Sequence, residues 1–282
     1  MQQTVLSRLI VHSAASPDLE LFPVERRELI LQALSSHGKV IAADLANSLR
    51  VSVDTIRRDL NQLVTEGLAR RVHGGALPAA PFPRPVAERS AQASTIKPEL
   101  AEKAAALIQP KSVVIFDGGS TNHELVRWIP RELAFTAVTP SLPVATALSE
   151  LPLVEVIVLG GKILGRELVT TGARAVKDIN DFRADICYLG VCAVHRQVGV
   201  STFSVEELEL KQALIRCAGT VAAIISAEKF GKMAPFVVGP SRILTNAFVE
   251  SEADAKEIEQ LRIDGVCVWP ERRPEVTRAN TT

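Results

Sequence analysis

Aromatic side chains are scarce in this chain of 282 residues, since they make up 4% of it and include one Tyr and two Trp. Proteins that bind RNA or single strands stack bases on aromatic side chains, so no such platform is expected here. Cysteine is also rare, and no two of the four cysteines have the two-residue spacing of a zinc site or a redox pair. We therefore expect neither a metal nor a cofactor. We interpret the cysteines as buried, reduced thiols of a cytoplasmic protein, at positions Cys187, Cys192, Cys217 and Cys267.

Long apolar runs and net charge are missing too. No run approaches the about twenty residues of a membrane span, and Arg8 and His12 interrupt the mildly apolar first stretch, so no signal peptide or membrane association is expected. Residues 1–22 are predicted to be a loosely ordered tail. The chain has 32 Lys and Arg against 32 Asp and Glu, but the first 97 residues carry twelve basic against nine acidic side chains. A mildly basic front and few aromatics favour duplex DNA as the partner of the N-terminal part.

The stretch from residue 51 to 77 combines the largest number of agreeing local signals. Ser52 is a good N-cap, Asp54 places a carboxylate in the first turn, and Gly67 can end a helix in a left-handed conformation. Apolar side chains at helical spacing would form the buried stripe of this helix, namely Val53, Ile56, Leu60, Leu63 and Val64. Polar side chains would then project on the opposite face and its flank, namely Thr55, Arg58, Gln62, Arg57 and Asn61.

A basic hairpin and two further helices complete this unit. Residues 68–72 are predicted to be a strand, and His73-Gly74-Gly75 supplies residues that tolerate the positive φ of a tight turn. Upstream, residues 23–36 and 42–49 fit two helices, with a short turn at 50–52. Residues 23–77 therefore predict a winged helix-turn-helix domain, whose last helix would enter the major groove of DNA.

A short amphipathic helix with two arginines is, by itself, more often a solvated surface helix than a DNA reader. The helix in front and the wing behind favour DNA binding, and Asp59 is interpreted as a structural residue that pairs with a neighbouring arginine. Thr55, Arg58 and Gln62 are predicted to read bases, whereas arginines on the flank and wing would hold phosphates. The full set of predicted DNA-binding residues is Ser52, Thr55, Arg57, Arg58, Asn61, Gln62, Arg70, Arg71 and His73.

The segments ERRELILQALSSHGKV and SVDTIRRDLNQLVTEGLARRVHGGA resemble the N-terminal signature of the DeoR family of bacterial transcriptional repressors. The run Thr55-Ile56-Arg57-Arg58-Asp59-Leu60 and the end His73-Gly74-Gly75-Ala76 are its most specific parts. The resemblance implies double-stranded operator DNA as the partner. A homodimer or homotetramer is expected, because one winged helix reads only a few base pairs.

Residues 78–97 contain four prolines and are predicted to be a linker without a packed element. Beyond it, residues 98–282 alternate helical patterns with strands that are apolar on both faces, which predicts an α/β, Rossmann-like αβα domain with a mainly parallel sheet. Helices are predicted at 99–108, 122–128, 142–151 and 205–218, and strands at 112–116, 135–138, 154–159, 186–191 and 221–225, with a closing helix and strand within 253–268.

Ligands of such sheets collect where strands end and helices begin. Asp117-Gly118-Gly119-Ser120-Thr121 lies at such a junction, and its glycines would let backbone N–H groups approach an anion, although the same residues also fit a plain tight turn. Glu206 and Lys211 stand at helical spacing, which is more often a solvated face. Other predicted effector-binding residues lie in neighbouring loops, namely Ser141, Gly160, Gly161, Gly190 and Lys229.

In this order the loops resemble the effector domain of the DeoR family, which is similar to the sugar-phosphate isomerase and CoA-transferase superfamily. The resemblance implies that Asp117, Gly119, Ser120 and Thr121 hold the phosphate and hydroxyls of a small phosphorylated metabolite, with Ser141 at the border and Lys211 and Lys229 as cations. The chain departs from the family pattern at three places, with Pro140 for Asn, Cys192-Ala193 for Asp-Gly, and Ala227-Glu228 near an expected Asp-Ser.

Two functions fit these residues. One is a ligand-controlled transcriptional repressor of a carbohydrate operon, and the other is a sugar-phosphate isomerase with an accessory DNA-binding module. An isomerase requires a carboxylate base and a group that polarises the carbonyl. Cys192 stands where the most plausible carboxylate would be, and the isomerase leaves the DNA-binding module unexplained. We therefore predict a regulator and not an enzyme.

Overall fold

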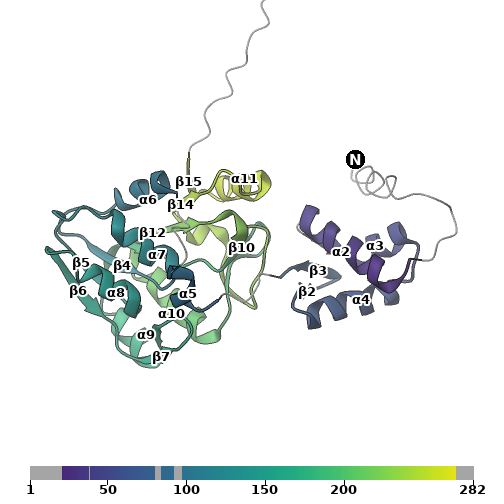
Figure 1. Ribbon diagram of the computed structural model, residues 1–282, viewed down its shortest axis with the longest axis horizontal. Helices are drawn as coiled ribbons and strands as arrows, with labels where there is room; N and C mark the ends of the chain where they lie inside the picture. Colours follow the sequence, from purple (N-terminus) through teal and green to yellow (C-terminus); the bar gives the residue numbers. More distant parts are fainter. Residues whose placement is uncertain (1–20, 38, 80–83, 92–96, 271–282) are drawn as a thin grey trace, which may run out of the picture. The chain divides into compact units, whose positions relative to one another are not determined.

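The computed structural model describes residues 21–37, 39–79, 84–91 and 97–270 (Figure 1), so the predicted tail at 1–22 lies almost wholly outside the described residues. The chain divides into two compact units. The first contains the described residues up to 79 together with Gly231–Pro235, and the second contains the described residues from 84 to 230 and from 236 to 270. No helix in the described part of the chain has both the length and the apolar composition to cross a membrane.

The first unit consists of three helices and a small antiparallel sheet. Helices α2 (Pro23–His37), α3 (Ala42–Leu49) and α4 (Val53–Thr65) follow the predicted ranges closely. The sheet has the order β1-β3-β2, with β1 (Val40–Ile41), β2 (Ala69–Val72) and β3 (Gly75–Pro78). The hairpin β2–β3 is the predicted wing, whereas β1 was not predicted because two residues carry no periodic pattern.

Helix α4 begins and ends as its sequence predicts. The Ser52 side chain accepts a hydrogen bond from the Thr55 backbone N–H at 3.0 Å, and Gly67 has a φ of 73°. Within the predicted stripe, Ile56, Leu60 and Leu63 are fully buried, but Val53 is 36% exposed and its predicted burial is wrong. Helical side chains tilt toward the N-terminus, so the side chain of the first residue of α4 points past the helix end.

The two glycines of the wing serve different purposes. Gly74 has a φ of 76°, as the tight turn requires, but Gly75 is not in the left-handed region, so its predicted positive φ is wrong. Gly75 is needed for close approach instead, since a Cβ at this position would lie 1.9 Å from the Val40 carbonyl oxygen of the neighbouring strand β1.

The predicted linker at 78–97 contains an unpredicted helix, α5 (Val86–Ala91), so the absence of a packed element is wrong there. Val86 is 1% exposed, and its backbone N–H donates to the Arg166 carbonyl at 2.9 Å. The four prolines all precede this helix in the sequence, and Pro85 stands directly before its first residue, where proline is compatible with a helix start. Residues 80–83 and 92–96 of the same segment lie outside the described residues.

A seven-stranded parallel sheet forms the centre of the second unit, with the order β15-β14-β12-β9-β4-β5-β6. Its strands are β4 (Val113–Phe116), β5 (Phe135–Thr139), β6 (Val154–Val158), β9 (Ala184–Tyr188), β12 (Ala218–Ile225), β14 (Asn246–Val249) and β15 (Cys267–Trp269). The helices are α6 (Pro98–Ala105), α7 (Ser120–Leu125), α8 (Leu142–Leu148), α9 (Ala173–Ile179), α10 (Val205–Arg216) and α11 (Ala255–Ile263), with short 3-10 helices η1 (Val126–Trp128), η2 (Ala227–Lys229) and η3 (Ser241–Ile243).

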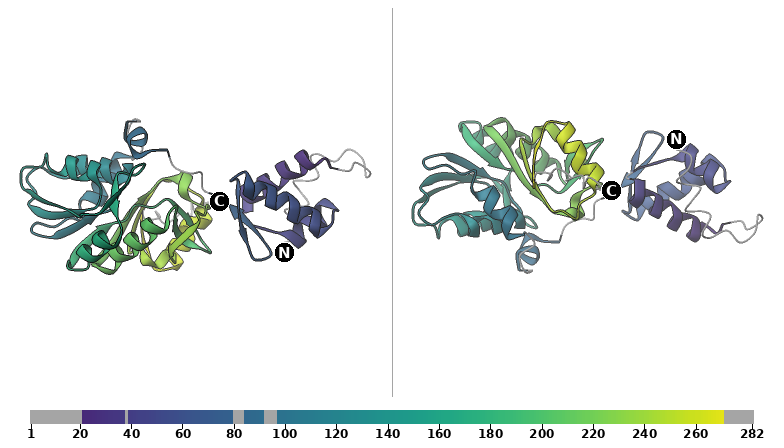
Figure 2. Two further views of the ribbon diagram at one scale, coloured as in Figure 1. Left: turned by 90° about the horizontal axis from the view of Figure 1, so that it is seen from below. Right: turned by 90° about the horizontal axis from the view of Figure 1, so that it is seen from above.

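Side chains of the central strands are buried on both faces of this sheet. Along β4, Val114 and Phe116 pack with residues of α6, α7 and α8, whereas Ile115 packs with residues of α9 and α10. Figure 2 shows helices on both sides of the sheet. The alternation confirms the predicted αβα layers, because strands covered on both faces read as continuous apolar runs.

Short antiparallel strands were not predicted. They form the hairpin of β7 (Lys162–Leu164) and β8 (Val169–Thr171), and a sheet with the order β10-β11-β13 from β10 (Ala193–His195), β11 (Gly199–Thr202) and β13 (Phe236–Gly239). Strands of three or four residues are too short for a periodic signal. They matter for the site because β8 and β11 lie next to the predicted effector loops.

Candidate functional site

The outward surface of α4 carries the candidate DNA contacts. Arg57, Arg58, Asn61 and Gln62 are exposed, and Thr55 is half-buried. Arg57 pairs with Asp54 at 3.0 Å on the surface, where an ion pair contributes little stability. Arg58 makes no hydrogen bond or ion pair with any other residue that the structure describes, so its guanidinium is available to a partner.

Three other predicted DNA-binding residues already make contacts within the unit. Ser52 and Thr55 are joined through their hydroxyls at 2.9 Å as part of the cap, and Gln62 accepts from Arg27 of α2 at 2.5 Å. Gln62 also donates to Glu66 at 3.0 Å, which ties the end of α4 to its own last turn. On the wing, Arg71 and His73 are exposed and Arg70 is half-buried.

Asp59 is structural, as predicted, but its partner is distant in the sequence. Both of its carboxylate oxygens accept from Arg26 of α2, from Nε at 2.5 Å and from a terminal nitrogen at 3.1 Å. The two side chains are only 9% and 6% exposed, and the hydrogen bond to Asp59 raises the pKa of Arg26. This pair fixes α4 against α2 and so sets which residues of α4 face outward.

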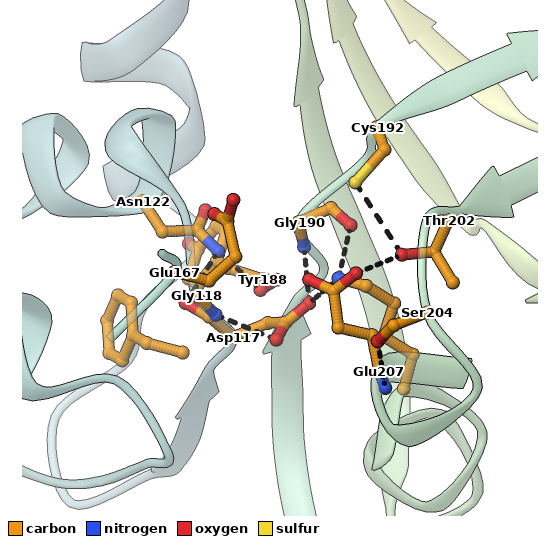
Figure 3. Close-up of polar contacts among 12 residues, drawn as sticks. Asp117, Gly118, Asn122, Glu167, Tyr188, Gly190, Cys192, Thr202, Ser204 and Glu207 are labelled. Carbon is orange, nitrogen blue, oxygen red and sulfur yellow. Dashed lines mark hydrogen bonds and ion pairs between the residues drawn. The ribbon is translucent and has the colours of Figure 1, made fainter. Parts of the chain in front are cut away.

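The second candidate site lies at the carboxyl ends of β4 and β9 (Figure 3). Asp117 directly follows β4, and its side chain accepts from Lys211 Nζ at 2.5 Å, from the Gly190 N–H at 2.9 Å and from its neighbour Gly118 at 2.7 Å. Lys211, from α10, also donates to the Gly190 carbonyl at 2.7 Å. Asp117 and Lys211 are each almost fully buried. The alternative that Lys211 belongs to a solvated helix face is therefore wrong.

The charges around Lys211 keep it protonated. Burial by itself would lower the pKa of the Lys211 ammonium, but the charge of Asp117, the nearby Cys192 and Glu207, and the hydrogen bond to Asp117 together raise it. Since both oxygens of Asp117 accept hydrogen bonds, from Lys211 and two backbone N–H groups, the carboxylate joins β4, β9 and α10. Gly190 is required by this contact, because a Cβ there would lie 2.4 Å from the Gly118 carbonyl oxygen.

The loop after Asp117 opens α7. Gly119 has a φ of 113°, which favours glycine, and Ser120 and Thr121 are half-buried at the start of the helix. Asn122 is buried and donates to the Asp117 and Tyr188 carbonyls at 3.1 and 2.8 Å, which holds the two strand ends together. Sequence reasoning missed Asn122, although an Asn directly after the Gly-Gly-Ser-Thr run is a signal that could have been used.

Further polar contacts come from the start of α10. Thr202 donates to Glu207 at 2.7 Å and lies 3.7 Å from the Cys192 sulfur, and Ser204 caps the helix by accepting from the Glu207 backbone. Burial raises the pKa of the Cys192 thiol, so it stays protonated at neutral pH. Glu206, by contrast, is exposed and is not brought into this cluster.

Other predicted effector residues lie at different depths. Ser141 is 1% exposed, and its hydroxyl has no hydrogen-bond partner among the residues that the structure describes. Gly160 and Gly161 are exposed at the start of β7, where a Cβ on Gly161 would lie 2.5 Å from the Thr171 carbonyl oxygen. Gly161 therefore serves the close approach of β7 and β8.

Lys229 is the cation of this site without an acidic partner. It ends η2 after β12, and its side chain makes no ion pair within the described ranges of the chain. Burial lowers the pKa of Lys229, and the positive charges of Arg89 and Lys211 lower it further, although Cys192 and Glu228 partly oppose this.

Arg89 and Glu167 lie outside the predicted effector-binding set. Arg89 of α5 forms an ion pair with Glu167 of the turn between β7 and β8, and it lies 3.5 Å from the Ser120 hydroxyl. Arg89 follows the usual basic residues of the DeoR family in the predicted linker but was not assigned to the site, and Glu167 belongs to a turn without a recognisable motif.

The cysteines form no disulfide, and the described residues form no metal-binding group. All four cysteines are free, but Cys267 is exposed and Cys192 half-buried, so their predicted burial holds only for Cys187 and Cys217. The described residues bring no three His, Cys, Asp or Glu side chains together in a group that could hold a metal.

Comparison with known proteins matches both units. Residues 26–80 match the family described as the DeoR-like helix-turn-helix domain, and residues 92–250 match the DeoR C terminal sensor domain. A protein of Escherichia coli O157:H7 whose name assigns it to repression of the aga operon is 32% identical over 86% of this chain and 91% of its own length. The deoxyribose operon repressor of Escherichia coli K12 is 31% identical over 76% of this chain and 85% of its own length. The glycerol-3-phosphate regulon repressor of the same strain is 28% identical over 80% of this chain and 90% of its own length.

Proposed function

Because this chain belongs to the DeoR family, we propose that it is a transcriptional repressor of a carbohydrate-catabolic operon, released from its operator by a phosphorylated metabolite. The observation that carries the proposal is the combination, in one chain, of a DeoR-type helix-turn-helix with a sensor domain in which the partly buried Lys229 makes no ion pair with another described residue. The similar proteins are named as repressors of the aga, deoxyribose and glycerol-3-phosphate systems, which supports a sugar or polyol operon as the target.

Operator recognition follows from the outward face of α4. Arg58 and Asn61 are exposed and turned away from the buried stripe, so α4 can lie in the major groove with Arg58 donating to a guanine. Arg57 and Arg71 would contact phosphates, which set affinity and register rather than sequence preference. Thr55 and Gln62 can join the base contacts only if they exchange their present partners, Ser52 and Arg27.

The effector would bind at the end of β4. An anion is the expected ligand because Lys229 is partly buried and uncompensated, and a charge-assisted hydrogen bond to phosphate would remove the cost of holding it there. Ser141, with its unpartnered buried hydroxyl, and the backbone of Gly118–Thr121 would contact the sugar part. The sensor unit would also form the oligomer interface, since paired half-sites need paired winged helices.

The isomerase alternative finds less support. A base must be free to take a proton from the substrate, but Asp117 is bound by Lys211 and two backbone N–H groups, and Glu207 is bound by Thr202. Cys192 is held as a neutral thiol. The similar proteins are named as transcriptional regulators, which agrees with a function other than catalysis.

The proposal can be tested with the purified full chain. Operator sequences would be selected from a random duplex library, and their release would be followed by fluorescence anisotropy while pentose, hexose and polyol phosphates are added. Release by a phosphorylated compound, without conversion of that compound, supports the proposal. Failure to enrich any DNA sequence, or isomerisation at enzyme-like rates, would contradict it.

A further inference from the structure

An ion pair between Arg89 and Glu167 lies beside the loop that follows β4. Arg89 is 25% and Glu167 16% exposed, and one terminal nitrogen of Arg89 pairs with one carboxylate oxygen of Glu167. The other terminal nitrogen lies 3.5 Å from the Ser120 hydroxyl, and Nε donates to the Arg84 carbonyl at 2.8 Å. The guanidinium edge that carries both terminal nitrogens is therefore turned toward the start of α7.

We propose that Arg89 binds the phosphate of the effector and that Glu167 occupies the place of this phosphate in the free protein. The inference rests on the proposed function and names two residues of the effector site, one of which comes from α5, near the start of the second unit. Glu167 is thus an internal anion that the effector must displace.

The geometry leaves Arg89 with unused capacity. A guanidinium can bind an oxyanion through two parallel N–H groups, and phosphate fits this arrangement as well as carboxylate does. Glu167 uses only one of its oxygens, and the Ser120 contact is at the outer limit of a hydrogen bond. A phosphate at this place could bind both terminal nitrogens of Arg89, and the charge of Lys229, which acts on that of Arg89, would favour the same anion.

Glu167 is not well accommodated as an anion. Burial raises the pKa of its carboxyl, the nearby charge of Glu207 raises it further, and the charge of Arg89 only partly opposes these effects. The next residue, Leu168, has a φ of 50°, a region that leucine rarely adopts. Its conformation is held by the hydrogen bonds from the Leu168 N–H to the Leu164 carbonyl and from the Leu142 N–H to the Leu168 carbonyl. Release of the Glu167 side chain to water would relieve the buried charge.

Displacement of Glu167 would act on α5 as well. In the turn between β7 and β8, the Arg166 carbonyl accepts a hydrogen bond from the Val86 N–H at 2.9 Å. Arg89 lies about one helical turn after Val86 on α5. In chain order α5 is the first helix after the DNA-binding unit. An effector that displaces Glu167 from Arg89 would therefore change the contacts that hold α5. Glu167 and the effector then compete for one guanidinium. Loss of Arg89 should therefore weaken effector binding, whereas loss of Glu167 should strengthen it.

The test measures binding of inorganic phosphate to the full chain by calorimetry, at constant ionic strength and in a mildly alkaline buffer. Arg89→Gln should weaken binding about tenfold or more, since it removes charge-assisted hydrogen bonds. Arg89→Lys should lose less, because it keeps the charge but not the two parallel donors. Glu167→Gln should bind phosphate several-fold more tightly than the wild type, because the internal competitor is gone. A merely structural role of the ion pair predicts weaker binding in both variants.

A half-exposed ion pair on α11 provides matched controls. Arg262 and Glu259 lie 3.7 Å apart and are 26% and 41% exposed, so Arg262→Gln and Glu259→Gln change the same charges of the same unit elsewhere. Both controls should bind phosphate as the wild type does. Phosphate binding that is unchanged in Arg89→Gln, weaker in Glu167→Gln, or absent from every protein would overturn the inference.

Operator release separates this inference from the proposed function. If sugar phosphates release Arg89→Gln from operator as readily as the wild type, Arg89 is not an effector ligand and the repressor function stands. If phosphate binds through Arg89 but the chain selects no DNA sequence, the inference stands and the proposed function fails.

Discussion

Replacement of Asp59 by Ala should unfold the DNA-binding unit while leaving the sensor unit folded. The variant keeps the Arg26 guanidinium in a place where it is 9% exposed but removes the carboxylate that binds it at 2.5 and 3.1 Å. Breaking a buried ion pair on one side costs about 3–5 kcal/mol. A unit of about sixty residues has a total stability of only about 3–9 kcal/mol, so the loss is comparable to the whole.

The aromatic composition of the chain allows the unfolding of each unit to be measured separately. Both tryptophans, Trp128 and Trp269, and the single tyrosine, Tyr188, lie in the sensor unit. Tryptophan fluorescence in a urea titration therefore reports the sensor unit alone, whereas far-ultraviolet circular dichroism reports both units. Asp59→Ala should lose helical signal at low urea without any shift in the fluorescence transition, and it should no longer bind operator.

Two further variants identify the cause. Arg26→Met combined with Asp59→Leu removes both charges and should recover most of the stability. Replacement of a buried ion pair by apolar side chains often leaves the free energy of unfolding unchanged. Asp54→Ala breaks the exposed pair with Arg57 in the same helix and should cost at most about 1 kcal/mol. An Asp59→Ala protein whose first transition lies within about 1 kcal/mol of the wild type would refute this reasoning.

Three other predictions concern the two sites. Arg58→Ala should cost about 1–3 kcal/mol of operator affinity and relax sequence preference, whereas Arg71→Ala should weaken binding to all sequences and reduce its salt dependence; equal effects on selected and random duplexes would contradict the assignment of Arg58. Lys229→Met should be more stable than the wild type at neutral pH, because burial disfavours the charged form of Lys229 and lowers its folded-state pKa. This destabilisation is complete below the lowered pKa, so the difference should shrink as pH rises through that pKa toward 10.5, and the variant should lose its response to effector. Gly190→Ala places a Cβ 2.4 Å from a carbonyl oxygen and should strongly lower the melting temperature, whereas Gly165→Ala has free space around its Cβ and should not.

Local sequence signals were sufficient for the DNA-binding unit. The cap at Ser52, the stop at Gly67 and the spacing of Ile56, Leu60 and Leu63 each act within a few residues, and the structure has all of them. The partner of Asp59 was not predictable in the same way. Arg26 lies 33 residues earlier, and only the packing of α2 on α4 brings the two together.

The sensor unit shows the same division between local and non-local information. Continuous apolar strands predicted the parallel sheet, because burial on both faces leaves a direct mark on composition. The roles of Asp117 and Lys211 depend on contacts between residues 94 positions apart, so the sequence could not indicate that they neutralise each other. Arg89 was not assigned to the site for a further reason, since the prolines before it favoured a linker and α5 is stabilised by contacts with a distant turn.

The central claim is that one chain couples operator binding to a phosphorylated metabolite. Coupling between two ligands is reciprocal, so a metabolite that weakens operator binding by some factor must itself bind more weakly, by the same factor, when operator is present. A hundredfold preference for the DNA-free state corresponds to about 2.7 kcal/mol. The decisive measurement is therefore the affinity of the full chain for the best releasing sugar phosphate, with and without saturating operator. We expect the two factors to agree and the unphosphorylated sugar to have no effect; a metabolite affinity that operator leaves unchanged would contradict the account.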